Sequence, residues 1–106
     1  MNLIVKPAAS EALNEVSFHE TEGVRIEAIF VGSCALYVDH YLWIDETQKE
    51  DTKVKVEGIP FLISKDSLTY LPDKLYVDYN PTLGYKLSSD EETFKYSLRL
   101  TRREKH

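Results

Sequence analysis

The chain has 106 residues, of which 42% are hydrophobic and 29% charged, and its formal net charge is −5. This length suits one domain with a single core, and the acidic balance argues against nucleic acid as a partner, because phosphate binding needs a basic surface. One cysteine cannot form an internal disulfide, and neither a secretory signal nor an apolar run of the roughly 20 residues of a membrane helix is visible, so we expect a cytoplasmic protein without membrane contact.

The start of the chain predicts a strand followed by a helix. Residues 2–6 are β-prone, and Pro7 has the fixed φ that suits a first helical turn. We expect the helix to continue to about Val16. Its apolar stripe, at helical spacing, consists of Ala9, Ala12, Leu13 and Val16.

Two alternating segments, residues 23–31 and 36–45, predict long strands on either side of a glycine-containing break. The second half of the first segment is apolar on both faces, so we expect it to run into the core. The second segment places Tyr37, Tyr41 and Trp43 on one face. Packing in the core and an exposed protein-binding patch are both open interpretations of these aromatic residues.

The rest of the chain predicts short strands and one short helix, which together indicate a β-rich α+β domain. Ser64 can cap a helix that reaches about Leu71. The expected strands are 53–57, 59–63, 75–79, 83–87 and 94–100, the last with Phe94, Tyr96, Leu98 and Leu100 on one side. Residues 1–100 then form the core domain. The basic residues 101–106 are interpreted as a frayed tail or, alternatively, as a contact for an anionic group.

The order of these segments resembles the HesB/IscA-like iron–sulfur cluster biosynthesis family. The resemblance is carried by Gly-Val-Arg-Ile leading to Gly-x-Cys in residues 23–34, by the Gly-Ile-Pro-Phe-Leu-Ile start of residues 58–71, by Leu-Tyr-Val-Asp-Tyr in 75–79 and by Gly-Tyr-Lys-Leu in 84–87. It implies a pseudo-barrel of mixed β-sheets with an N-terminal amphipathic helix and one short helix. It also implies a relationship to A-type carriers of iron–sulfur clusters.

The chain departs from that family in its cysteines. The family's active carriers use one cysteine after the second strand and a C-terminal Cys-Gly-Cys, and only the first has a counterpart here, at Cys34. Where the family places Cys-Gly-Cys, this chain has the strand-like segment 94–100. A cluster is normally held by four thiolates. Cys34 is therefore interpreted either as a small buried hydrophobic residue or as the one retained ligand for iron or an iron–sulfur cluster, with further ligands from elsewhere.

Histidines do not complete such a site on sequence grounds, because the spacing of His19, His40 and His106 does not resemble a ligand pair. We expect His40 to be a solvent-facing or hydrogen-bonded strand histidine. The sequence also lacks Gly-x-Ser-x-Gly, phosphate-loop and His-Glu-x-x-His motifs, so we expect no enzymatic activity.

Two functions remain open. One is iron or cluster handling through Cys34, and the other is a non-catalytic protein-binding module that keeps the fold without metal. Both imply a protein partner, either an iron–sulfur assembly protein or an apo-protein target. We expect the chain itself to be a monomer or a weak homodimer.

Overall fold

The computed structural model describes residues 1–32 and 36–103, which form nine strands and two helices. The helices are α1 (Pro7–Asn14) and α2 (Lys65–Thr69). The strands are β1 (Asn2–Val5), β2 (Glu22–Gly32), β3 (Leu36–Glu46), β4 (Thr52–Val56), β5 (Ile59–Ile63), β6 (Lys74–Asn80), β7 (Gly84–Ser88), β8 (Thr93–Leu98) and β9 (Thr101–Arg102).

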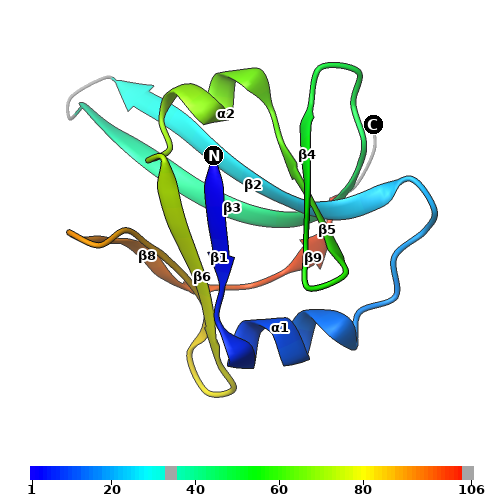
Figure 1. Ribbon diagram of the computed structural model, residues 1–106. Helices are drawn as coiled ribbons and strands as arrows, with labels where there is room; N and C mark the ends of the chain where they lie inside the picture. Colours follow the sequence, from blue (N-terminus) through cyan, green and yellow to red (C-terminus); the bar gives the residue numbers. More distant parts are fainter. Residues whose placement is uncertain (33–35, 104–106) are drawn as a thin grey trace.

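The strands form two mixed sheets (Figure 1). One has the order β1-β6-β7-β8 and the other the order β4-β5-β2-β3-β9. The pairs β1–β6, β2–β5 and β3–β9 are parallel, while the remaining neighbours are antiparallel. The predicted β-rich fold of mixed sheets with two helices is therefore confirmed.

A single apolar core lies between the two sheets. Phe61 and Ile26 come from the five-stranded sheet, Leu75 and Leu87 from the four-stranded sheet, and all four are fully buried. Alternation explains this arrangement, because every second residue of a strand faces the same side. The two sheets therefore share their apolar interior.

The two helices cover the ends of this core. In α1, Pro7 occupies the first turn and Ala9 and Leu13 are buried, and the helix ends two residues before the expected Val16. In α2, the Ser64 side chain accepts a hydrogen bond from the backbone N–H of Ser67, as the sequence predicts. Neither helix in the described part of the chain is long and apolar enough to cross a membrane.

The β2–β3 hairpin is the longest feature and extends beyond its sheet (Figure 1). Its inner half is flanked by β5, which pairs with β2 at Val24 and Arg25, and by β9, which pairs with β3 at Trp43 and Ile44. Beyond Ala28 the apolar side chains emerge from the core, and the exposed fractions of Ile29 and Phe30 are 43% and 49%. The expectation that this half of β2 runs into the core is wrong.

Tyr37, Tyr41 and Trp43 lie on the face of β3 that points away from the core. The residues that β3 contributes to the core, Leu42 and Ile44, lie on the opposite face. Core packing of these aromatic residues is therefore the wrong alternative. Trp43 and Tyr41 are half-buried and stack at a centroid distance of 6.0 Å, whereas Tyr37 is exposed.

The C-terminal segment differs from the expectation in two ways. Residues 101–103 are not frayed, because Thr101–Arg102 form β9 against β3 and the backbone N–H of Arg103 donates to Ile44 at 2.9 Å. Strand β8 also lacks simple alternation, since Ser97 has a φ of 59° and the β7–β8 register shifts twice. Consequently Leu98 is buried while Tyr96, predicted for the same face, is exposed.

Candidate functional site

The sequence directs attention to the free end of the β2–β3 hairpin. Cys34, the predicted ligand, lies outside the described residues. The nearest described backbone on its two sides is that of Gly32 and Leu36, which are Cα partners at the last step of the hairpin ladder. The described residues nearest in the chain to the predicted ligand therefore lie at this end of the hairpin.

Beside the hairpin end lies a cleft of about 500 Å³. Its apolar lining comes from Val38 in β3, Phe94 in β8 and the Tyr70–Pro72 segment after α2, and its rim carries the acidic residues 90–92 of the β7–β8 turn. Ser89 shapes this turn, because its hydroxyl accepts hydrogen bonds from the backbone N–H groups of Glu91 and Glu92. The cleft thus combines apolar walls with three acidic residues and one cation, Lys74.

Next to the cleft, His40 lies inside the protein with an exposed fraction of 3%. Its ring stacks on Phe94 at a centroid distance of 5.1 Å, and neither ring nitrogen has a hydrogen-bond partner among the described residues. Burial is the main cause that lowers the pKa of His40, with Lys95 contributing in the same direction while Asp39 and Glu92 oppose it. The expected solvent-facing or hydrogen-bonded His40 is wrong: the imidazole is neutral and packed as a core ring.

Strand β8 contacts β3 on both faces at this point. Phe94 packs on His40 on the inner face, while the Lys95 ammonium lies 2.6 Å from Asp39 and over the Tyr41 ring on the outer face. The Lys95 hydrogen bond, together with one from Tyr41, lowers the pKa of the Asp39 carboxyl. This is the segment in which the resemblance places a Cys-Gly-Cys ligand motif. Here it is an ordered strand held at two adjacent residues.

The outer face of the hairpin is held by a second set of charges. Arg25, buried under the β3–β4 connection, donates to Asp45 at 2.6 Å and to both oxygens of Asp51 at 2.8 and 2.6 Å. The hydrogen bonds that Arg25 donates to Asp51 are the largest cause that raises the pKa of Arg25. Arg103 continues the network, since it contacts both oxygens of Glu27 at 2.8 and 2.9 Å and lies over the Trp43 ring.

Arg102 similarly joins β9 to the start of β2. It contacts both oxygens of Glu22 at 3.0 and 2.9 Å, and these hydrogen bonds are the largest cause that lowers the pKa of Glu22, to about 2. The basic side chains of residues 102 and 103 therefore meet acids of their own chain. The two arginines join β9 to β2 through these ion pairs, whereas a contact of the tail with an anionic group stays a prediction.

A metal site is not assembled among residues 1–32 and 36–103, where no group of three His, Cys, Asp or Glu side chains could hold an ion. His19 is exposed beside Glu22, His40 is covered by Phe94, and His106 lies outside the described part. Whether Cys34 binds iron stays a prediction. The described residues do not fit a complete cluster site.

The sequence does not predict the cleft, nor the contacts of Phe94 and Lys95 in β8 with His40 and Asp39 in β3. The alternation of residues 94–100 predicts a strand, but nothing local indicates which strand Phe94 and Lys95 meet across the core. One signal was available: Asp39-His40 and Phe94-Lys95 each combine a charged with an aromatic or imidazole side chain at consecutive strand positions. When two strands cross, such pairs can meet with the ring side chains on one face and the charged side chains on the other.

The two mixed sheets and the N-terminal helix define the β-rich fold of this domain. Solved structures share this fold. A protein from Lactobacillus salivarius, described as a putative Fe-S biosynthesis protein with a novel fold, aligns with a TM-score of 0.67 and 15% identity over 96% of this chain and 97% of that one. A second, from Lactobacillus acidophilus, aligns with a TM-score of 0.64 and 19% identity, covering 96% and 90%. Escherichia coli SufA, involved in biosynthesis of iron-sulfur clusters, aligns with a TM-score of 0.60 and 18% identity, covering 87% and 91%.

At the sequence level, the family model for iron-sulphur cluster biosynthesis matches residues 1–102. The chain therefore belongs to the iron–sulfur cluster biosynthesis family. No curated protein matches it. The family assignment made from the sequence is confirmed, whereas the role of Cys34 is left as a prediction.

Proposed function

We propose that this protein takes part in iron–sulfur cluster biosynthesis as a protein-binding member of the family, and that it does not carry a cluster by itself. Iron or a cluster is its cargo only in a complex, where Cys34 supplies one thiolate and the partner supplies the others. The protein performs no catalytic step of its own. It acts in the cytoplasm, where a single thiol stays reduced.

The observation that supports this proposal is the structure of β8. A carrier needs its C-terminal thiolates to reach the cysteine of the hairpin and to release a cluster. Here the corresponding residues contain no cysteine, and they are held to β3 by the His40–Phe94 stack and the Lys95–Asp39 ion pair. A strand fixed in this way suits a surface for protein contact better than a movable ligand arm.

Anaerobic reconstitution with iron and sulfide tests the proposal. We expect the isolated protein to bind iron well below one atom per chain and to develop no visible cluster absorbance, because fewer than four ligands are available. The Cys34→Ser variant should give the same result. Stoichiometric iron with a visible cluster spectrum that Cys34→Ser abolishes would contradict the proposal and establish a carrier.

A further inference from the structure

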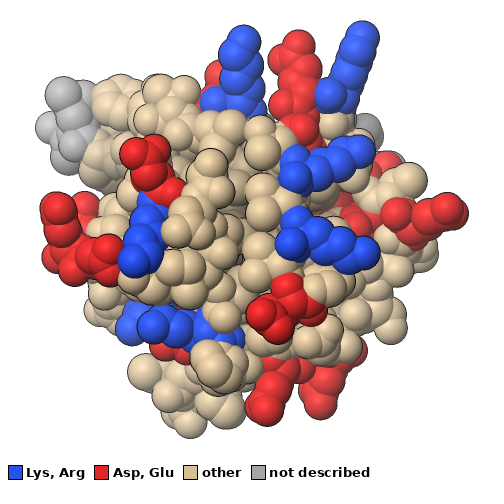
Figure 2. All heavy atoms as spheres, viewed as in Figure 1, with Lys and Arg blue, Asp and Glu red and all other residues tan. Residues whose placement is uncertain are grey.

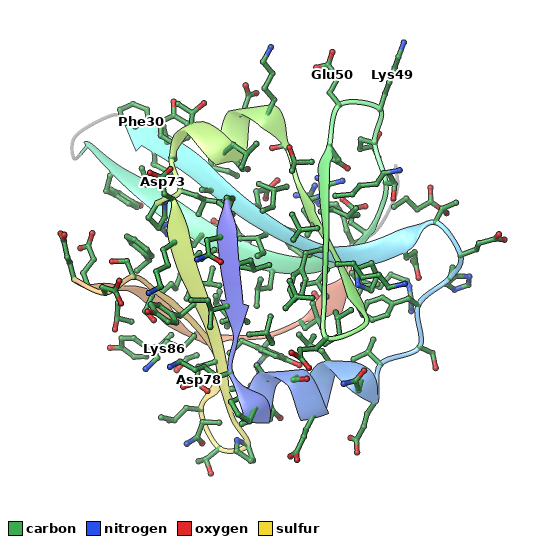
Figure 3. The ribbon with its side chains drawn as sticks, viewed as in Figure 1. Phe30, Lys49, Glu50, Asp73, Asp78 and Lys86 are labelled. Atoms are coloured by element: carbon green, nitrogen blue, oxygen red, sulfur yellow. The ribbon has the colours of Figure 1, made fainter. Side chains whose placement is uncertain are left out.

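The free end of the hairpin exposes an unusual amount of apolar surface. Phe30 of β2 stacks on Tyr70, which follows α2, at a centroid distance of 6.0 Å, and both rings are about half exposed. On the opposite face of the same two-stranded segment, Ile29 and Tyr37 are also exposed. We call Phe30 and Tyr70, which share a face with Val38 of the cleft, the hairpin-end surface. Figure 3 shows Phe30 at this end of β2. Adjacent exposed apolar side chains of this kind mark interaction sites.

The acidic residues 90–92 of the cleft beside this surface give the site a negative charge. Of its three rim acids, Asp90 is engaged by the Tyr76 hydroxyl at 2.6 Å and by Lys74 at 3.6 Å. The carboxylates of Glu91 and Glu92 form no ion pair within the described residues, and both residues are exposed. Below them, Val38 and Phe94 are only partly buried. The cleft therefore offers two uncompensated negative charges above an apolar floor.

We propose that the hairpin-end surface and the adjoining cleft bind a basic segment of a partner protein, in which lysine or arginine flanks an apolar side chain. The apolar side chain covers Val38 and Phe94, and the flanking cations meet Glu91 and Glu92. This inference rests on the proposed protein-binding function and gives the chemistry of the partner. The net charge of −5 favours the same partner, because it attracts a basic chain over long range.

A second copy of this chain fits the site less well. In a two-fold dimer the same patch lies on both sides of the interface, so both copies would bring Glu91 and Glu92 into it, and the cation of the cleft, Lys74, already pairs with Asp90. Like charges placed together in an interface disfavour the complex. The acidic rim thus selects against self-association and for a partner of opposite charge.

Titration of the full-length protein with designed peptides tests the inference. The probe is a synthetic peptide in which lysines flank phenylalanine and leucine, and two matched peptides replace the lysines by glutamate or the apolar residues by serine. We expect only the first to bind in calorimetry and to shift the NMR signals of Phe30, Val38 and Phe94. Its affinity should fall as salt is added.

Variants assign the binding to the cleft. Glu91→Gln combined with Glu92→Gln should weaken the lysine peptide by about fivefold to tenfold and reduce the salt dependence, and Phe30→Ser should weaken it without changing that dependence. Glu50→Gln is the matched control, since Figure 3 shows Glu50 on the β3–β4 connection, away from Phe30. It should bind as the wild type does.

Three results would overturn the inference: no binding of the lysine peptide at millimolar concentration, equal binding of the glutamate peptide, or self-association in sedimentation that involves Phe30 and Tyr70. These results leave the reconstitution experiment unaffected. Conversely, a cluster on the isolated chain would remove the proposed function even if the peptide binds. The two failures can therefore be told apart.

Discussion

At the scale of single residues, His40 is the most unusual feature of this protein. A buried polar group normally has a hydrogen-bond partner, whereas both nitrogens of His40 have none among the described residues. The charged groups that influence it are Asp39 on its own strand, Lys95 on β8 and Glu92 on the turn before β8. Because charging the ring inside the core is unfavourable, folding keeps His40 neutral.

The stability of the protein should consequently depend on pH near neutrality. Burial lowers the pKa of His40 on folding from its ordinary value of 6.5, so its contribution to stability is fully present above that value and is lost as the pH falls through the folded pKa. Between about pH 7.5 and about pH 5.5 we expect the free energy of unfolding in urea to fall by about 1 kcal/mol.

His40→Leu should remove this loss, because leucine fills the site without a titrating group. His19→Gln is the control, since it removes an exposed histidine and leaves the buried one in place. An unchanged pH dependence in His40→Leu would show that the buried ring is not its source.

At the scale of elements, β7 and β8 approach each other closely at Gly84. Gly84 has a φ of +94°, and a Cβ at this position would lie 2.6 Å from the Leu98 carbonyl oxygen. Gly58 also has a positive φ, of +78°, but a Cβ there meets no atom within 4 Å. The two glycines differ in the space around them and share the left-handed backbone.

Alanine substitutions should separate these two effects. Gly58→Ala should cost about 1 kcal/mol, from backbone strain alone, whereas Gly84→Ala should cost about 3 kcal/mol, because β8 must also move away from β7. Urea unfolding of both variants measures the difference. If both substitutions lower the free energy of unfolding equally, β8 can move away at Leu98 without a measurable cost.

Most elements could be predicted from the sequence because they depend on local patterns. The alternation of β2 and β3, Pro7 at the start of α1 and the Ser64 cap of α2 all act within a few residues. What failed depends on distant partners. Which face of β3 is buried could not be decided, since His40 reads as polar and Trp43 as apolar, and the two-residue β9 is too short to carry a pattern. The site was predicted only as far as Cys34, because the cleft joins three separate segments.

At the scale of the whole molecule, the two sheets form one cooperative unit, because their inner faces share a core. Leu87 of β7 is fully buried in that core, and Trp43, the only tryptophan, lies in the other sheet. Acidic and basic side chains are interspersed on the surface in Figure 2. Nothing in this arrangement suggests that one sheet is stable alone.

Leu87→Ala should therefore destabilise both sheets equally, by about 2 to 5 kcal/mol. Unfolding followed by Trp43 fluorescence and by the NMR signals of Tyr85 in the four-stranded sheet should give one midpoint, before and after the substitution. A shift of the Tyr85 midpoint alone would divide the protein into two independently stable sheets.

The parallel pairing of β1 with β6 has a consequence for synthesis on the ribosome. Asn2–Val5 align with residues 74–77 of β6, the strand with which β1 pairs in the described part of the chain, so β1 emerges long before its partner. Until β6 has been made, the apolar residues of β1, among them Leu3, cannot be buried as they are in the folded protein. The β2–β3 hairpin, in contrast, can form from residues that are close in the sequence. Closing so long a loop is slow. The nascent chain therefore keeps β1 unpaired until residues 74–77 have been translated, and during this interval its apolar residues are open to aggregation or to binding by a chaperone.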